Sequence, residues 1–159
     1  MAIAANSDKT RIGWREWLAL PDLAIPAVKA KIDTGARTSA LHTFDLTTFV
    51  DNDQEFVRFR LHPLQKREDI ELQCTAAVID RRVVRDSGGH AEERLVIASQ
   101  VRLGEHCWPI ELTLTNRDDM MFRMLLGRSA LKSAGLLIDA GRSFVLGRQL
   151  AKTYDQQGA

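Results

Sequence analysis

Apolar and polar residues alternate with a period of two along most of the chain. Val28, Ala30 and Ile32 alternate with polar neighbours, and the same pattern recurs around residues 57–61, 70–76 and 110–114. Because successive side chains of a strand point to opposite faces, this alternation predicts half-buried antiparallel strands. Short clusters of Gly, Asp, Asn and Ser separate the strands, which is typical of a small barrel or sandwich.

Only one segment has a convincing helical pattern. It runs from about Ser129 to Ala134 and is followed by Gly135, a residue that commonly ends helices. Residues 1–10 and 148–159 are rich in polar and small residues, which predicts a tail at each end. We therefore expect an all-β domain over residues 11–147, folded as a small closed barrel with one short helix.

Composition and charge limit the classes of function. The chain has 159 residues, of which 45% are hydrophobic and 27% charged, as expected for one globular domain. Its net charge is +1, so bulk charge points to neither a nucleic acid nor a membrane surface as partner. The N-terminus lacks the pattern of a signal peptide, which favours the cytoplasm. Cys74 and Cys107 lie in alternating segments and are predicted to be reduced core residues.

The most informative stretch is the end of the first alternating strand, where Ile32 is followed by Asp33, Thr34 and Gly35. The glycine permits a tight turn, and the threonine hydroxyl can hold the loop by a hydrogen bond to a neighbouring segment. Two such carboxyl groups that face each other cannot both ionise, so they share a proton and can activate water against a peptide carbonyl. The tripeptide alone also occurs as an ordinary Asx turn, so the surrounding sequence must decide between a turn and a catalytic loop.

That context resembles the retropepsin-like aspartic peptidases, in which two apolar residues and a glycine pass beside the catalytic loop and Gly-Arg begins the lone helix. The sequence is more closely similar to the bacterial RimK-associated family, whose members have been called ATP-dependent zinc proteases. The similarity covers nearly the whole predicted domain. The matching motifs are Ile12–Trp17, Lys31–His42, Glu111–Arg117 and Met124–Arg128.

The resemblance implies a retropepsin-like acid-protease fold with Asp33, Thr34 and Gly35 as catalytic residues. RimK is an ATP-grasp ligase that adds glutamates to a ribosomal protein. The family's association with it implies a peptidase that acts on glutamate-rich tails, and a ligase of the RimK type as a partner. One catalytic loop supplies half of a dyad, so we expect a homodimer in which Asp33 of each protomer faces the other on the two-fold axis. Asp139 and Gly141 look like a degenerate second copy, but Ala140 lacks the hydroxyl and an ordinary turn is the preferred interpretation.

Two arginines and Ala36, which follows the catalytic loop, are expected to contact the substrate. Retropepsins usually carry an acid two positions after the catalytic-loop glycine, and it pairs with the Gly-Arg arginine; here that position is Arg37. Arg37 and Arg128 would then suit an acidic substrate, because guanidinium groups bind carboxylates with two parallel hydrogen bonds. The alternative is that Arg128 pairs with an acid such as Asp139 or Glu111, while Arg37 faces solvent.

A hairpin with Gly88 and Gly89 at its tip lies between the two motifs, where retropepsin-like chains carry the flap that closes over substrate. Two glycines suit a mobile lid, so both are further candidates for substrate contact. A plain exposed hairpin explains these residues equally well.

The spacing of the His and Cys residues does not predict a zinc site. None of the four histidines has the spacing of His-Glu-x-x-His, and no Cys-x-x-Cys or nucleotide-binding P-loop occurs. We therefore expect neither a metal nor a cofactor. A zinc site assembled from scattered residues, for instance His106 and Cys107 with a distant partner, is the alternative. Two other functions stay open, namely a non-catalytic module that binds acidic tails or a ligase, and a zinc-dependent protease.

Overall fold

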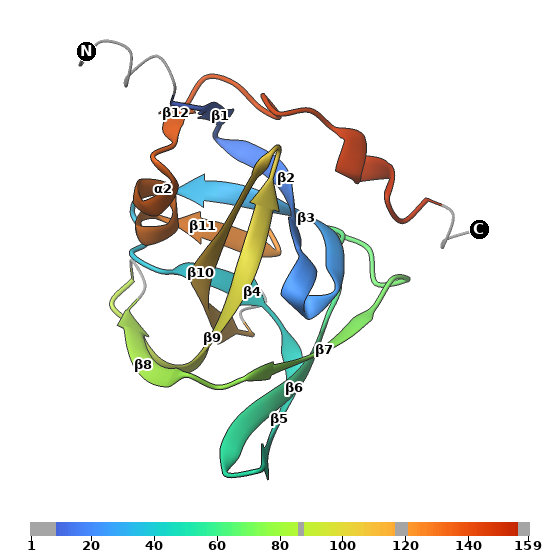
Figure 1. Ribbon diagram of the computed structural model, residues 1–159, viewed down its shortest axis with the longest axis vertical. Coiled ribbons are helices and arrows are strands. Elements are labelled where there is room, and N and C mark those ends of the chain that lie inside the picture. The colour runs from blue at the N-terminus through green and yellow to red at the C-terminus, as the bar shows by residue number, and fades with distance from the viewer. Residues whose placement is uncertain (1–8, 86–87, 117–120, 156–159) are drawn as a thin grey trace.

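The computed structural model describes residues 9–85, 88–116 and 121–155, which consist mostly of β-strands with one short α-helix (Figure 1). The strands are β1 (Arg11–Gly13), β2 (Arg15–Leu20), β3 (Ile25–Asp33), β4 (Ser39–His42), β5 (Phe44–Asp51), β6 (Gln54–Leu61), β7 (Leu72–Ala77), β8 (Asp80–Arg85), β9 (Ala91–Leu103), β10 (His106–Thr115), β11 (Met124–Gly127) and β12 (Leu137–Asp139). The α-helix is α2 (Arg128–Ala134), and the 3-10 helices are η1 (Pro21–Leu23) and η2 (Gln149–Lys152).

The largest sheet returns on itself. Its order is β10-β4-β11-β3-β2-β9-β8, and β9 also pairs with β10. The seam between β2 and β9 is the single pair Ala19 with Arg102, so the ring is less regular than the closed barrel that the sequence predicts. Strands β5, β6 and β7 form a separate three-stranded sheet, and the β5–β6 hairpin projects from the body (Figure 1). The prediction of a mostly β fold with one helix is confirmed.

The strands are not all antiparallel, as the alternation suggested. Strand β3 runs parallel to β11, β4 runs parallel to β10, and β1 runs parallel to β12. Side chains alternate with the same period in both kinds of sheet, so hydrophobic periodicity alone cannot distinguish them.

Apolar side chains of β3 and the short helix enclose the core close to the predicted catalytic loop. Val28 and Ala30 are fully buried and Ile32 is 8% exposed, as their alternation predicts. The predicted helix is confirmed as α2, which begins one residue earlier than predicted, at Arg128. Gly135 ends it with a φ of 65°, a left-handed conformation that favours glycine.

The C-terminal segment up to residue 155, which the sequence analysis assigned to a tail, packs against the body. Tyr154 is 1% exposed; its hydroxyl donates a hydrogen bond to the carbonyl of Ala27 at 2.5 Å and accepts one from the Ala27 amide at 3.3 Å. Burial raises the pKa of Tyr154 to about 12. Because Ala27 lies on β3, this contact holds the strand that leads to Asp33.

The two cysteines differ in their surroundings. Cys74 is buried, and burial raises the pKa of its thiol to about 11. Cys107 is exposed, so its prediction as a core residue is wrong. On β10 the buried side chains include Trp108, Ile110 and Leu112, which places Cys107 on the outward-facing register. Within the described part of the chain, no helix is long and apolar enough to span a membrane.

Candidate active site

Asp33 ends β3 and opens a tight turn that fixes one of its carboxylate oxygens. The amides of Gly35 and Ala36 donate hydrogen bonds to Asp33 Oδ1 at 3.0 and 3.2 Å. The other oxygen, Oδ2, accepts no hydrogen bond from the described residues. The carboxylate is therefore oriented by backbone groups through one oxygen, which leaves the second available to a ligand or a proton.

Strand β11 and the start of α2 brace this turn. Gly127 pairs with Asp33 in the parallel register, and a Cβ at Gly127 would lie 2.7 Å from the carbonyl carbon of Thr38. Only glycine permits this approach of two backbones. The Gly127 amide donates to the buried Ser39 hydroxyl at 2.9 Å, and the Arg128 amide donates to the carbonyl of Ala36 at 2.7 Å.

The two predicted substrate arginines have different environments. The guanidinium of Arg128 donates to the carbonyl of Thr34 at 2.9 Å, so it holds the Asp33 turn instead of pairing with an acid. Of the acids considered in the sequence analysis, Glu111 pairs with Arg82 and Asp139 accepts a bond from its own turn. Arg37 is exposed, and its guanidinium forms no ion pair with any described residue.

A cleft of about 920 Å³ lies beside Asp33. Of the predicted site residues, Asp33, Gly35, Ala36 and Arg37 line it. Thr34 and Arg128 adjoin the turn without lining the cleft. The remaining lining residues are Thr38, Ala40, Arg82, Val83, Val84, Arg85, Arg94, Glu111, Thr113, Thr115, Leu125 and Ser129.

The predicted flap is the β8–β9 hairpin, and its strand β8 forms one side of the cleft. Val83, Val84 and Arg85 line the cleft. Gly88 and Gly89 are exposed at the hairpin turn; Gly89 has a φ of 84°, and a Cβ there would meet nothing within 4 Å. The hairpin thus borders the cleft as a flap would, while its glycines lie outside the lining.

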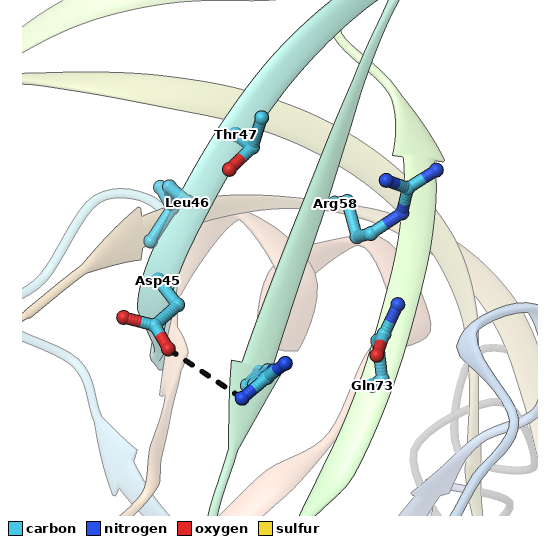
Figure 2. A pocket seen from close by; sticks show the side chains of 6 residues that line it. Asp45, Leu46, Thr47, Arg58 and Gln73 are labelled. Carbon is cyan, nitrogen blue, oxygen red and sulfur yellow. Dashed lines mark ion pairs between the residues drawn. The ribbon is translucent and has the colours of Figure 1, made fainter.

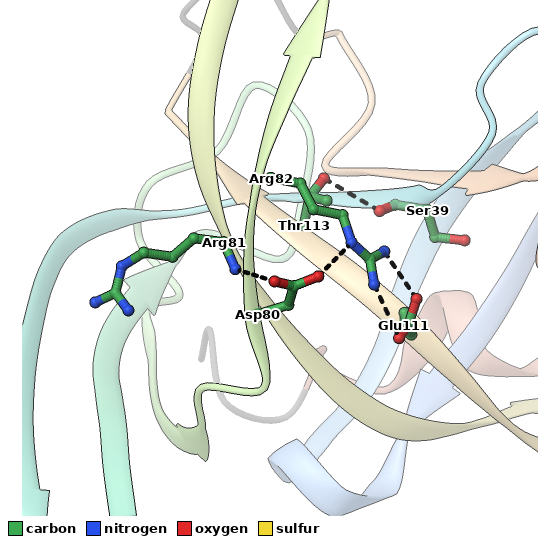
Figure 3. Close-up of polar contacts among 6 residues, drawn as sticks. All are labelled: Ser39, Asp80, Arg81, Arg82, Glu111 and Thr113. Carbon is green, nitrogen blue, oxygen red and sulfur yellow. Dashed lines mark hydrogen bonds and ion pairs between the residues drawn. The ribbon is translucent and has the colours of Figure 1, made fainter.

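The cleft has a polar wall that the sequence analysis did not identify as a site. Glu111 on β10 binds the guanidinium of Arg82 through both oxygens, at 2.8 and 3.2 Å, and Asp80 accepts from Arg82 Nε at 2.8 Å (Figure 3). The hydrogen bond to Glu111 is the main cause that raises the pKa of Arg82 above its ordinary value, and the bond to Asp80 adds to it. Arg94, only 8% exposed, donates to Thr113 Oγ1 at 3.4 Å.

A signal for this wall was present in the motif that begins at Glu111. Glu111, Thr113 and Thr115 alternate along β10, so they share one face of the strand, and all of them line the cleft. The alternation of residues along β10 showed that these side chains lie together. It could not show that their face is turned toward Asp33.

The Asp139 segment forms the turn that the sequence analysis preferred. The Gly141 amide donates to Asp139 Oδ1 at 3.1 Å, and the Arg142 amide donates to the Asp139 carbonyl at 3.1 Å. Asp139 does not line the cleft. The carboxyl groups of Asp33 and Asp139 therefore do not meet in one site within the chain.

A second hollow, of about 540 Å³, lies on the three-stranded sheet (Figure 2). Arg60 pairs there with Asp45 at 3.7 Å. None of the predicted site residues lines this hollow, whose lining is Asp45, Leu46, Thr47, Arg58, Arg60 and Gln73.

The two histidine and cysteine candidates for a scattered zinc site lie in different surroundings. The described residues contain no group of three or more His, Cys, Asp or Glu side chains that could hold a metal ion. Of the scattered candidates, His106 Nε2 lies 2.5 Å from Thr10 Oγ1, and Cys107 Sγ lies 3.6 Å from Gln100 Oε1. The partners in these contacts are a threonine hydroxyl and a glutamine amide, whereas zinc in proteins is bound mainly by Cys, His, Asp and Glu.

Comparison with known proteins identifies relatives over almost the whole domain. The chain is 48% identical over 144 residues to a probable alpha-L-glutamate ligase of Shewanella halifaxensis, and 42% identical over 153 residues to one of Desulfotalea psychrophila. These matches cover 91% and 94% of this chain but 31% and 33% of the relatives. The chain thus spans about a third of the length of the curated relatives that it matches.

A solved structure shares the fold, and a family model matches most of the chain. The crystal structure of a Legionella pneumophila protein of unknown function has the same fold, with a TM-score of 0.72 and 23% identity over 86% of this chain and 98% of the other. The model of the family described as retropepsin-like aspartic endopeptidase RimB matches residues 11–149. With the Asp33 turn braced beside a cleft, the chain belongs to the RimB-like family of retropepsin-like aspartic endopeptidases.

Proposed function

We propose that this protein is an aspartic peptidase that hydrolyses a peptide bond in acidic, glutamate-rich tails. The observation that carries the proposal is the Asp33 carboxylate, which borders the cleft with Oδ1 fixed by two amides and with Oδ2 without a partner in the described chain. A rigidly oriented carboxyl group with one accessible oxygen is what general acid–base chemistry on water requires.

In the proposed mechanism, two Asp33 carboxyl groups share one proton. The ionised one accepts a proton from water as the oxygen attacks the peptide carbonyl, and the protonated one donates its proton to the carbonyl oxygen. Collapse of the tetrahedral intermediate breaks the C–N bond: one carboxyl group donates a proton to the leaving nitrogen, and the other carboxylate takes a proton from a hydroxyl group of the intermediate, which restores the shared proton. The backbone amides that hold Oδ1 keep each carboxyl group in position throughout.

The second carboxyl group is proposed to come from a second copy of the chain. Asp139 lies outside the cleft, so it does not supply a partner for Asp33. The exposed Thr34 hydroxyl forms no hydrogen bond with the described residues, although a threonine in such a loop is expected to hold a neighbouring segment. A two-fold dimer gives both Asp33 and Thr34 a partner from the other protomer.

The acidic substrate is supported by the chemistry of the cleft and by the names of the relatives. Arg37 lines the cleft and its guanidinium has no acidic partner among the residues described. Arg128 is an exposed residue that adjoins the cleft and holds the turn through one nitrogen, so it adds positive charge beside the cleft. Relatives named probable alpha-L-glutamate ligase suggest that the peptidase acts together with a glutamate ligase, on tails that such a ligase extends.

The decisive experiment compares the wild type with Asp33→Asn on a glutamate-tailed peptide, with and without a chelator. We expect cleavage by the wild type that is insensitive to the chelator and is lost in the variant, while folding and dimerisation persist. Activity that survives in the variant would contradict the mechanism, and activity lost with the metal would assign the protein to the zinc proteases. Binding without cleavage by the wild type would identify a non-catalytic module.

A further inference from the structure

Two arginines lie directly opposite each other in the hairpin that borders the cleft. Arg82 on β8 pairs in register with Arg94 on β9, and both line the cleft that holds Asp33. Like charges in directly opposed positions destabilise an antiparallel pair of strands. The arrangement therefore requires anionic groups beside the guanidinium groups.

The chain supplies those anions itself. Arg94 donates to Glu92 at 3.0 Å, and Arg82 donates to Asp80 at 2.8 Å and to both oxygens of Glu111. Glu111 differs from the other two acids because it also lines the cleft. Its ion pair is solvent-exposed, with 47% of the Glu111 side chain and 36% of the Arg82 side chain accessible. Water and a competing carboxylate can therefore reach this pair, so a substrate carboxylate can exchange with Glu111 on Arg82.

The arginine pair has a fixed relation to the catalytic turn. Thr113 Oγ1 accepts from Arg94 and donates to the carbonyl of Ser39 at 3.3 Å (Figure 3). The Ser39 hydroxyl accepts from the amide of Gly127, the residue paired with Asp33. All members of this chain of contacts except Asp33 are buried, so the network ties the polar wall to the strand beside the catalytic carboxylate.

We propose that Arg82 and Arg94 form a subsite for a carboxylate side chain of the substrate, and that Glu111 occupies this subsite in the free protein. Binding of an acidic peptide exchanges one carboxylate for another on Arg82 and releases Glu111 into solvent, while Asp80 and Glu92 keep the two arginines apart. The chain's own glutamate is then a competitor that lowers the apparent affinity for acidic substrates. This inference rests on the proposed function for the place of the substrate.

The test measures binding, in a background that does not need turnover. A fluorescent peptide with a run of glutamates and a matched glutamine peptide are titrated against Asp33→Asn, with anisotropy as the readout. Adding Glu111→Gln should tighten binding of the glutamate peptide about threefold, whereas Arg82→Gln should weaken it about three- to tenfold. Binding of the glutamine peptide should not change in either variant.

Arg81→Gln is the matched control. Arg81 neighbours Arg82 but its side chain points away from it (Figure 3). Arg81 pairs there with Glu55 at 2.6 Å. Its loss removes the same charge from the same strand, so a general electrostatic effect would weaken binding in both variants. If the subsite exists, Arg82→Gln should weaken binding of the glutamate peptide and Arg81→Gln should not. Arg94→Lys, checked for an unchanged melting temperature, should also lower the preference for the glutamate peptide.

Several outcomes would overturn the subsite. These are weaker or unchanged binding of the glutamate peptide in Glu111→Gln, equal losses in Arg81→Gln and Arg82→Gln, and failure of the starting protein to bind that peptide. Cleavage is scored separately in the protein with Asp33 intact. If binding follows the predicted pattern but no peptide is cleaved, the subsite stands and the peptidase function fails. If cleavage occurs without the pattern, the peptidase function stands and the subsite fails.

Discussion

Two Asp-x-Gly turns of this protein share a hydrogen bond and differ in their surroundings. In one, the Gly35 amide donates to Asp33 Oδ1 at 3.0 Å; in the other, the Gly141 amide donates to Asp139 Oδ1 at 3.1 Å. Each aspartate is the last residue of a strand, β3 in the first turn and β12 in the second. The hydrogen bonds of an Asx turn follow from the local sequence, so both segments form one.

In both turns the aspartate is paired with a glycine of a neighbouring parallel strand. Gly127 pairs in parallel with Asp33, and Gly13 pairs in parallel with Asp139. A Cβ on Gly127 would lie 2.7 Å from a backbone atom of the facing segment, and a Cβ on Gly13 would lie 2.3 Å from one. The same device therefore occurs twice: an Asx turn held against a glycine whose missing side chain lets two backbones meet.

The surroundings of the two turns differ. The Asp33 turn borders the cleft, and Thr34 presents a hydroxyl without a partner in the described chain. The Asp139 turn has Ala140 in that place and lies near Glu16, a fully buried carboxylate that accepts hydrogen bonds from the backbone, including the Gly13 amide at 2.7 Å. Only the Asp33 turn therefore borders the cleft, while the Asp139 turn adjoins a buried carboxylate that the backbone already holds by hydrogen bonds.

The largest expected difference comes from removing each carboxylate. Asp33→Asn should lower kcat at least about a thousandfold, because the amide cannot take the proton of water. Asp139→Asn should leave kcat nearly unchanged. Either amide oxygen can still accept the glycine N–H bond, so both melting temperatures should change little. Loss of activity in Asp139→Asn would show that the second turn takes part in the chemistry.

Adding a methyl group to each glycine tests whether the close approach matters equally. Gly127→Ala and Gly13→Ala should each destabilise the protein by about 3 kcal/mol, because the new Cβ meets backbone that cannot move aside easily. Urea unfolding measures this loss. Only Gly127→Ala should also lower kcat per folded molecule, since it displaces the strand beside Asp33. Wild-type stability in either variant would contradict the close approach at that glycine.

Exchanging the middle residues of the turns tests the role of the hydroxyl. If Thr34 holds the other protomer, Thr34→Val removes two hydrogen bonds per dimer, about 2 kcal/mol, and weakens dimerisation about thirtyfold. Analytical ultracentrifugation measures the dissociation constant. Ala140→Thr, the reciprocal change, should leave it unaltered. An unchanged constant in Thr34→Val would place the hydroxyl outside the interface.

The smallest effects are expected for the polar groups behind the turns. Glu16→Gln should cost about 1.5 kcal/mol and Ser39→Ala about 1 kcal/mol, because each leaves a buried amide with a weaker or missing acceptor. Of the two, only Ser39→Ala should raise KM for a peptide substrate, since Ser39 supports the cleft side. Equal effects of both changes on KM would mean that the two turns are not separated in function.

Much of the fold and the turn that holds Asp33 could be predicted from local sequence, whereas most of the cleft lining could not. Alternation placed β3 and β10, Gly135 marked the end of α2, and the Asp33 turn followed from its own residues. Cys107 was misplaced, because its segment alternates but its register faces outward. Tyr154 was missed, because an isolated aromatic residue in a polar segment has no periodicity to reveal its burial.

Local sequence predicted four of the strands, the helix and both Asp-x-Gly turns, because these depend on the conformational preferences and hydrogen bonds of neighbouring residues. The tertiary structure alone decided which turn borders a cleft and which residues face it. Arg128 reaches Thr34 across 94 positions of the chain, and Arg82 reaches Glu111 across 29. Such contacts depend on which strands become neighbours, and a period of two is the same in every pairing.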